Sequence, residues 1–271
     1  MAIIRETLTN VYTPDPTRVQ EAEAAIADFE KSFAPGAWLH LNKTTLIAEM
    51  RSRVRDPFQV NQGGQPFCGP ASVLVELVWK QPLRYVEICR SLYLVGGFQG
   101  TTRYIASSDE LRRSSYGNLR MPQTDWMILA TLRDVENVLF PVEPNAPDLI
   151  RNLAGMTKSW EMKGWMQEIL GYKKVKYNHA YLTNDISAMN DATAALKAGG
   201  AAFALITAEG MLSDRPPAVP FPSHWVALLG NISVQGDPVT FDIYTWCKQM
   251  RLKMDAGSFK KYLWATVTGT P

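Results

Sequence analysis

The chain has 271 residues, of which 46% are hydrophobic and 20% are charged, and its formal net charge is +2. This composition is ordinary for a globular protein, and the length suffices for one large domain or two small ones that share a cleft. The small net charge argues against a nucleic-acid or membrane partner, and no apolar run approaches the roughly 20 residues of a membrane span.

The N-terminal stretch MAIIRETLTN lacks the basic residues and the apolar core of a signal peptide. We therefore expect a cytoplasmic protein, or one that a specialised secretion system exports without a signal peptide. The three cysteines, Cys68, Cys89 and Cys247, show no zinc-binding spacing and are too few for a disulfide framework. The sequence predicts neither a metal site nor an organic cofactor.

The first part of the chain predicts helices. Residues 17–33 carry apolar side chains at helical spacing, and Thr17 after Pro16 is the expected N-cap. Another helix is expected to begin at Cys68. The remaining helices are predicted over residues 43–54, 83–94, 125–139, 158–170 and 186–197.

The hydrophobic period then changes from helical spacing to strand-like runs. AAFALITA, HWVALLGNI, VTFDIYTW and QMRLKM predict strands, and VQGDP between the middle two predicts a hairpin turn. The proline-rich residues 213–223 predict a stiff loop that ends directly before His224. A helical front followed by a strand-rich back predicts a single α+β domain with two lobes, roughly residues 1–175 and 176–271.

Cys68 lies where a glycine-rich segment, VNQGGQPF, turns into an apolar helix. The N-terminus of a helix favours a thiolate, because the helix dipole is positive there. A free cysteine is more often a small buried hydrophobic residue. Cys89, inside a predicted helix, fits that role, whereas the glycines and prolines around Cys68 do not.

His224 opens the apolar strand HWVALLG and is either a core histidine or a catalytic base. In the next strand, FDIYTW, alternation puts Asp242, Tyr244 and Trp246 on one face. If that strand pairs with the strand of His224, Asp242 could accept a hydrogen bond from the imidazole. A solvated carboxylate at a strand edge is the alternative.

Three segments together resemble the papain-like cysteine peptidases. In NQGGQPFCGPAS, Gln62 precedes Cys68 by six residues, as the glutamine precedes the nucleophile in that family. SHWVALLG is similar to the family's histidine strand, and YTW is similar to its Asn-Ser-Trp segment. FCGPAS looks closer to bacterial members such as bacteriocin-processing peptidases and injected toxins.

The resemblance implies a papain-like fold, with a helical N-terminal lobe that carries the nucleophile helix and a C-terminal lobe built on an antiparallel sheet. It implies that Cys68 is the nucleophile, that His224 is the base and that Gln62 completes the oxyanion hole, with Gln65 as a competing donor. Asp242 is the expected third catalytic residue because it accepts a hydrogen bond well; Tyr244, at the family's asparagine position, is the alternative. The resemblance also implies the following substrate contacts: Gly63, Gly64, Trp225 and Trp246.

The function implied is that of a cysteine protease that cleaves peptide bonds in a target protein. The similarity to injected toxins implies an effector delivered by a contact-dependent or type VI secretion system, with an immunity protein as partner. Two other functions stay open. One is a glutamine deamidase or transglutaminase-like acyltransferase that uses the same residues. The other is a catalytically dead binding module, because Tyr244 and Cys247 replace the family's asparagine and glycine.

Overall fold

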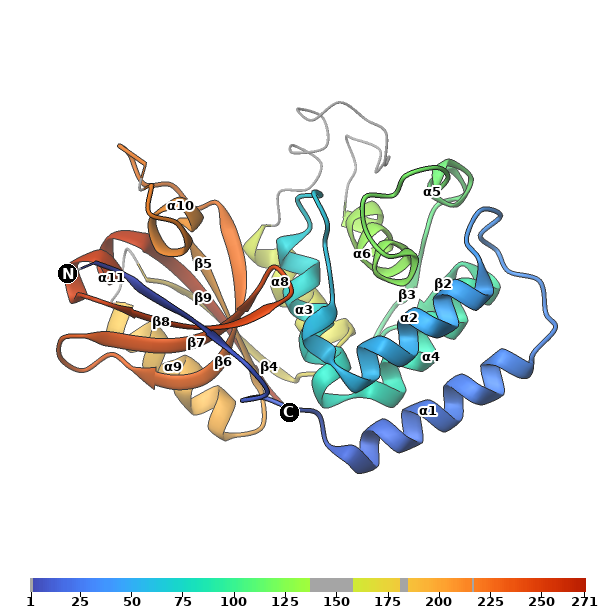
Figure 1. The fold of residues 1–271 in the computed structure, drawn as a ribbon, viewed down its shortest axis with the longest axis horizontal. Coiled ribbons are helices and arrows are strands. Elements are labelled where there is room, and N and C mark those ends of the chain that lie inside the picture. Colours follow the sequence, from blue (N-terminus) through green and yellow to red (C-terminus); the bar gives the residue numbers. More distant parts are fainter. Residues whose placement is uncertain (1, 137–157, 181–184, 216) are drawn as a thin grey trace. The chain divides into compact units, whose positions relative to one another are not determined.

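The computed structural model describes residues 2–136, 158–180, 185–215 and 217–271 (Figure 1). It divides into two compact units. The first, here called the sheet unit, comprises Met1–Tyr12, Met162–Gln167 and Gly171–Pro271. The second, the helical unit, comprises Thr13–Glu161 and Glu168–Leu170. Helices together with an antiparallel sheet confirm the α+β class.

In its described residues, the helical unit contains mostly helices and one small hairpin. Its elements are α1 (Pro16–Lys31), α2 (Lys43–Arg55), the short 3-10 helix η1 (Pro57–Gln59), α3 (Cys68–Lys80), α4 (Pro82–Val95), β2 (Gly97–Gln99), β3 (Tyr104–Ala106), α5 (Asp109–Ser114) and α6 (Gln123–Glu136). Helix α8 (Ser159–Glu168) has residues in both units. The predicted helices are confirmed within a few residues, except that the expected end of α6 at residue 139 lies outside the described residues.

The start of α1 differs from the prediction by two residues. Asp15 is the N-cap, and its side chain accepts hydrogen bonds from the backbone N–H groups of Thr17 and Arg18. Pro16 occupies the first helical position, where a missing N–H costs nothing. An aspartate before a proline is therefore the capping signal, and Thr17 is already inside the helix.

The sheet unit is built on seven antiparallel strands. They are β1 (Ile4–Leu8), β4 (Lys174–His179), β5 (Ala201–Ile206), β6 (His224–Ser233), β7 (Val239–Thr245), β8 (Lys248–Met254) and β9 (Leu263–Thr270), in the spatial order β1-β8-β7-β6-β5-β9-β4. Within the described residues of this unit, three helices lie entirely in it: α9 (Asp185–Lys197), α10 (Ala208–Leu212) and α11 (Ala256–Tyr262). The four predicted strands are β5 to β8, and the predicted hairpin turn joins β6 to β7.

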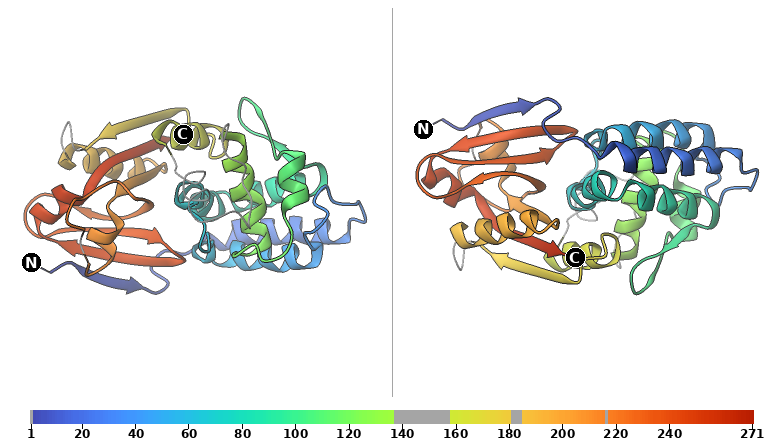
Figure 2. Two further views of the ribbon diagram at one scale, coloured as in Figure 1. Left: turned by 90° about the horizontal axis from the view of Figure 1, so that it is seen from above. Right: turned by 90° about the horizontal axis from the view of Figure 1, so that it is seen from below.

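Helix α9 lies along one face of the sheet (Figure 2). Its buried Ala188, Met189 and Ala192 belong to one hydrophobic core with Ala202 and Ala204 of β5. Alanines on both sides let the helix and the sheet approach closely, so that the core excludes water. This core fixes which face of the sheet is interior.

The division of the chain differs from the predicted lobes, 1–175 and 176–271. The first twelve residues belong to the sheet unit, because β1 pairs with β8 from Ile4 opposite Lys253 to Leu8 opposite Gln249. The sequence IRETL is short and mostly polar, so its strand structure depends on a partner far along the chain. Strands β4 and β9 were likewise not predicted.

Candidate functional site

Cys68 is the first residue of α3 and is partly exposed. The residue before it, Phe67, caps the helix with no side-chain hydrogen bond, and Pro70 has no N–H to be capped. The helix start therefore offers its positive end to an anion at the Cys68 position. Cys89 of α4 is different, since it is fully buried and burial raises the pKa of its thiol well above the usual range.

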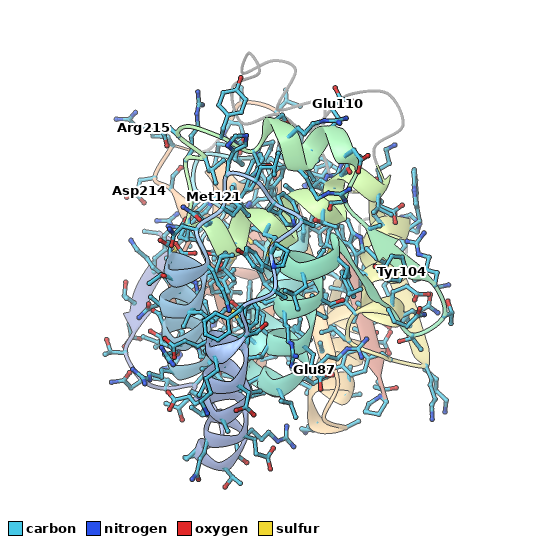
Figure 3. All side chains as sticks on the ribbon, turned by 90° about the vertical axis from the view of Figure 1, so that its right-hand side faces the viewer. Glu87, Tyr104, Glu110, Met121, Asp214 and Arg215 are labelled. Carbon is cyan, nitrogen blue, oxygen red and sulfur yellow. The ribbon has the colours of Figure 1, made fainter. Side chains whose placement is uncertain are left out.

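A tight turn precedes the helix. The backbone N–H of Gln65 donates to the carbonyl of Gln62 over 3.1 Å, and the side-chain Nε2 of Gln62 donates to the carbonyl of Gln65 over 2.9 Å. Gly63 adopts φ +57°, and a Cβ added there would lie 1.9 Å from the carbonyl oxygen of Arg120. Such a Cβ would also lie 3.1 Å from the Cβ of Met121, the next residue after Arg120, which Figure 3 labels.

This geometry gives Gly63 a role in the turn. A side chain there would collide with backbone, so glycine is required for the loop to close, whatever binds near it. Gly64 is exposed and has open space where a Cβ would be. The fold thus gives its own reason for glycine at position 63, and the substrate contacts expected at Gly63 and Gly64 stay predictions.

A buried ion pair holds the loop of residues 61–65 in place. Arg53 of α2 donates from Nε and Nη2 to the carboxylate of Asp125 at 3.2 and 2.7 Å, and both side chains are buried. The backbone N–H of Asn61 donates to the same carboxylate over 2.9 Å, and the side chain of Asn61 accepts from the N–H of Gly63 over 2.7 Å. Burial raises the pKa of Asp125 to about 6, although Arg53 and the N–H of Asn61 act in the opposite direction.

The two glutamines of the loop differ in access. The side chain of Gln65 is 3% exposed, whereas Gln62 is partly exposed. One N–H of the Gln62 amide is used within the turn, and an amide NH2 has a second donor. Solvent access therefore favours Gln62 over Gln65 as a donor to a bound molecule.

His224 opens β6 and pairs with Ile206 of β5. Its Nε2 is 2.8 Å from the hydroxyl oxygen of Thr245, and its ring centroid lies 4.7 Å from that of Trp246, at an interplanar angle of 32°. The side chain is buried, and burial lowers the pKa of His224 to about 4. Because the Thr245 hydroxyl is bonded to Nε2, Nδ1 is the ring nitrogen that is left to bond another group.

Asp242 does not orient His224, which corrects the prediction. In the β6–β7 pairing Asp242 lies opposite Gly230, six residues from His224 along β6. Its carboxylate is fully buried and accepts hydrogen bonds from the hydroxyl of Tyr12 at 2.8 Å and from Arg251 at 2.8 and 3.0 Å. Asp242 therefore ties β7 to β8 and to the N-terminal segment.

Strand register gives the physical reason. Leu228 of β6 faces Ile243 of β7, so both lie on the core face, together with Val226. His224 and Thr245 share that phase, because side chains alternate along a strand. Tyr244, the second candidate, alternates to the opposite face with Asp242, and it is 3% exposed.

A strained two-residue connection joins β7 to β8. Thr245 pairs with Lys248, and Trp246 and Cys247 between them adopt φ +46° and +59°. Residues other than glycine, asparagine and aspartate rarely occupy this left-handed region, which costs on the order of 1 kcal/mol or more each. The turn leaves the Trp246 ring 46% exposed while it packs against His224.

Trp225 is not supported as a substrate contact. It is 2% exposed, and alternation along β6 places it on the face of the sheet opposite to His224. A side chain this buried cannot meet a ligand without rearrangement of its surroundings. Trp246 remains available for that role.

The predicted residues thus fall into two groups, each described within its own unit. Gln62, Gly63, Gly64 and Cys68 form one continuous segment of the helical unit. His224 and Trp246 meet in the sheet unit, where Thr245 takes the place expected for Asp242. Thr245 belongs to the YTW segment, but only the strand register shows that it is the residue beside His224.

Within the described residues, no three His, Cys, Asp or Glu side chains gather in a way that could hold a metal ion. In that same part of the chain, no helix is long and apolar enough to cross a bilayer. A comparison of the sequence with models of known protein families and with curated proteins finds no match.

Proposed function

We propose that this protein is a papain-like cysteine hydrolase that cleaves peptide bonds in a protein substrate. The observation that carries the proposal is the environment of His224. Its imidazole is buried, neutral near pH 7 and held at Nε2 by Thr245, with Trp246 packed against the ring. In this proposal Nδ1 is the nitrogen left to accept the thiol proton, as a general base requires.

The position of Cys68 is the second support. A partly exposed thiol at a helix start is placed to act as a thiolate, which is the nucleophilic form. In the proposed reaction, Nδ1 of His224 takes the thiol proton while Nε2–H donates to the Thr245 hydroxyl. The Cys68 sulfur then attacks the substrate carbonyl carbon and forms a tetrahedral intermediate.

Breakdown of that intermediate completes the cycle. The imidazolium of His224 gives its proton to the leaving amine, the C–N bond breaks, and an acyl-enzyme remains on Cys68. His224 then takes a proton from water as the water oxygen attacks the thioester carbon. The C–S bond breaks, the new C-terminus is released, and the imidazolium returns its proton to the Cys68 sulfur. The amide of Gln62 and the backbone N–H of Cys68 would stabilise the oxyanion, and one such donor contributes about 3 kcal/mol.

Alkylation of cysteines provides a test that needs no known substrate. Cys68 and Cys247 are both partly exposed, so Cys247 is an internal reference on the same chain. At pH 6 an ordinary thiol is almost entirely protonated, and we expect iodoacetamide to modify Cys68 roughly tenfold faster than Cys247 or more. His224→Gln should abolish the difference, whereas His179→Gln, a change of an exposed histidine on β4, should preserve it.

The reaction itself is tested by incubating the protein with a cell lysate and mapping new N-termini by mass spectrometry. The parent should generate new termini that Cys68→Ala does not, and Cys89→Ala should behave like the parent. Release of ammonia from glutamine side chains without new termini would show a deamidase. Equal alkylation rates for Cys68 and Cys247, with no product of either kind, would exclude a hydrolase.

A further inference from the structure

The sheet unit carries a hollow of about 480 Å³ to which α8, β4, α9 and β9 all contribute residues. This volume lies within the usual range of small-molecule pockets, about 300–1,000 Å³. On the side of α9, the lining residues Ala194 and Ala195 are small and leave the space open. The polar lining consists mainly of lysine ammonium groups and threonine hydroxyls.

Four lysines and one carboxylate give the hollow a net positive charge. The lysines are Lys163, Lys173, Lys174 and Lys176. The carboxylate is that of Asp191, which pairs with Lys176 at 2.5 Å and also accepts from the side chain of Asn178 over 3.1 Å. In the part of the chain that the structure describes, the other three lysines have no carboxylate within 4.0 Å, so three positive charges are left unbalanced at one place.

Strand register adds hydroxyl donors next to two of these lysines. Lys174 of β4 lies opposite Thr270 of β9, and Lys176 lies opposite Thr268. Residues paired across two strands share a face, so the two ammonium groups and the two hydroxyls lie on the same side of the sheet. Ammonium groups only donate hydrogen bonds, and a hydroxyl can donate as well, so this lining suits a ligand rich in acceptor oxygens.

We propose that the hollow binds a small soluble molecule that carries two or more phosphate groups. Phosphate oxygens accept hydrogen bonds from ammonium groups and hydroxyls, and lysine serves as a point charge toward phosphate. A single carboxylate would balance only one of the three unpaired lysines, whereas two phosphates balance all of them. The assignment does not rest on the proposed hydrolase activity, and its test requires no catalysis.

Titration calorimetry with inorganic tripolyphosphate tests the proposal on the full chain. We expect saturable binding at one site, and an affinity that falls as the salt concentration rises. Replacing two of the unpaired lysines, Lys163→Gln with Lys174→Gln, should weaken binding roughly tenfold or more. Lys253→Gln, a change of an exposed lysine on β8 outside the hollow, is the matched control and should bind like the parent.

Asp191→Asn provides a variant with the opposite expected effect. Loss of this carboxylate releases Lys176 to the ligand, so tripolyphosphate should bind more tightly than to the parent. Weaker binding by Asp191→Asn, or equal loss in the Lys253→Gln control, would overturn the assignment. Equal affinity for citrate would overturn the phosphate class, and binding of anionic lipid vesicles without binding of tripolyphosphate would overturn a soluble ligand.

Discussion

A hydroxyl, and not a carboxylate, is the hydrogen-bond partner of His224. The Thr245 side chain can fix the tautomer and orientation of the ring, but it carries no charge that would stabilise an imidazolium. The buried ring is therefore neutral over most of the pH range, and in the proposed reaction its positive charge forms only together with a thiolate. Thr245 is a positioning residue in this proposal, since it acts through the imidazole.

Replacement of Thr245 should separate its role from that of Asp242. Thr245→Val removes the hydroxyl at nearly the same volume and should slow alkylation of Cys68 at pH 6 by roughly tenfold, because the tautomer is no longer fixed. Thr245→Ser should retain the fast reaction. Asp242→Asn should leave alkylation unchanged and instead lower the free energy of unfolding by about 2 kcal/mol, since its bonds to Tyr12 and Arg251 hold strands together. The opposite pattern would restore Asp242 as the orienting residue.

The lowered pKa of His224 also predicts how stability depends on pH. The histidine titrates near 6.5 in the unfolded chain and near 4 in the folded protein, so between these values the unfolded state binds more protons. The free energy of unfolding should thus fall as the pH is lowered from 6.5 to 4, by about 3 kcal/mol from this group. The His224→Gln variant has no such titrating group, so its free energy of unfolding should fall less between pH 7 and pH 4 than that of the parent. Urea denaturation of both proteins at both pH values measures this, because the other titrating groups contribute equally to parent and variant. If the parent and the variant differ in stability by the same amount at pH 7 and at pH 4, a buried neutral ring is contradicted.

At the scale of elements, the segment before α3 depends on a group that lies outside it. Asp125 of α6 holds the N–H of Asn61, and Asn61 in turn holds the N–H of Gly63, so the position of the Gln62 amide is determined from the core of the helical unit. The glycine turn and the anchor have separate functions. Glycine lets the loop curl, and the carboxylate fixes where the curled loop lies.

Removal of the anchor should show this dependence. Asp125→Leu leaves Arg53 buried without its partner and should lower the free energy of unfolding by about 3–5 kcal/mol. The double change Arg53→Met with Asp125→Leu removes both charges and should recover most of that loss, yet it still gives Asn61 no acceptor. Amide hydrogen exchange of residues 61–65 in the double variant should therefore be faster than in the parent, with α3 unchanged. Parent-like protection of the loop would show that the carboxylate does not position it.

The sequence predicts those elements that are marked by residues within them or next to them. The beginning of α3 at Cys68 follows from glycines and prolines next to an apolar helical run, and β5 to β8 follow from short β-branched runs between turn residues. Thr245 could not be identified in the same way. Its face depends on the hairpin register, which is set by the Trp246–Cys247 turn, and that pair carries none of the Asn-Gly or Asp-Gly signals that usually mark such a turn. Strand β1 was not predicted for a related reason: its partner β8 lies near the other end of the sequence.

At the scale of the whole molecule, the helical unit is an insertion within the sheet unit. The chain forms β1, then the helical unit, which ends at Leu170, and only then the other six strands of the seven-stranded sheet. Each unit has its own hydrogen-bonded structure, so a change confined to β1 should affect the sheet unit alone. The sheet depends on β1 to cover the outer edge of β8.

Deletion of residues 2–8 tests this independence. Loss of β1 leaves β8 as an exposed edge strand, so amide exchange along β8 should rise and the protein should become more prone to associate. The amides of α2, α3 and α4 should keep their protection. Loss of protection in those helices as well would show that the two units do not fold separately.

The pairing of β1 with β8 also affects when the sheet can form during protein synthesis. Leu8 and its partner Gln249 are 241 positions apart in the sequence. At a synthesis rate of about 5–20 residues per second, β1 leaves the ribosome roughly 12–50 seconds before the strand that completes it. During that interval the helical unit can fold behind it, while the IRETL segment remains an unpaired strand. The polar side chains of Arg5, Glu6 and Thr7 protect the segment during this interval, since charged and polar strands resist pairing with other chains.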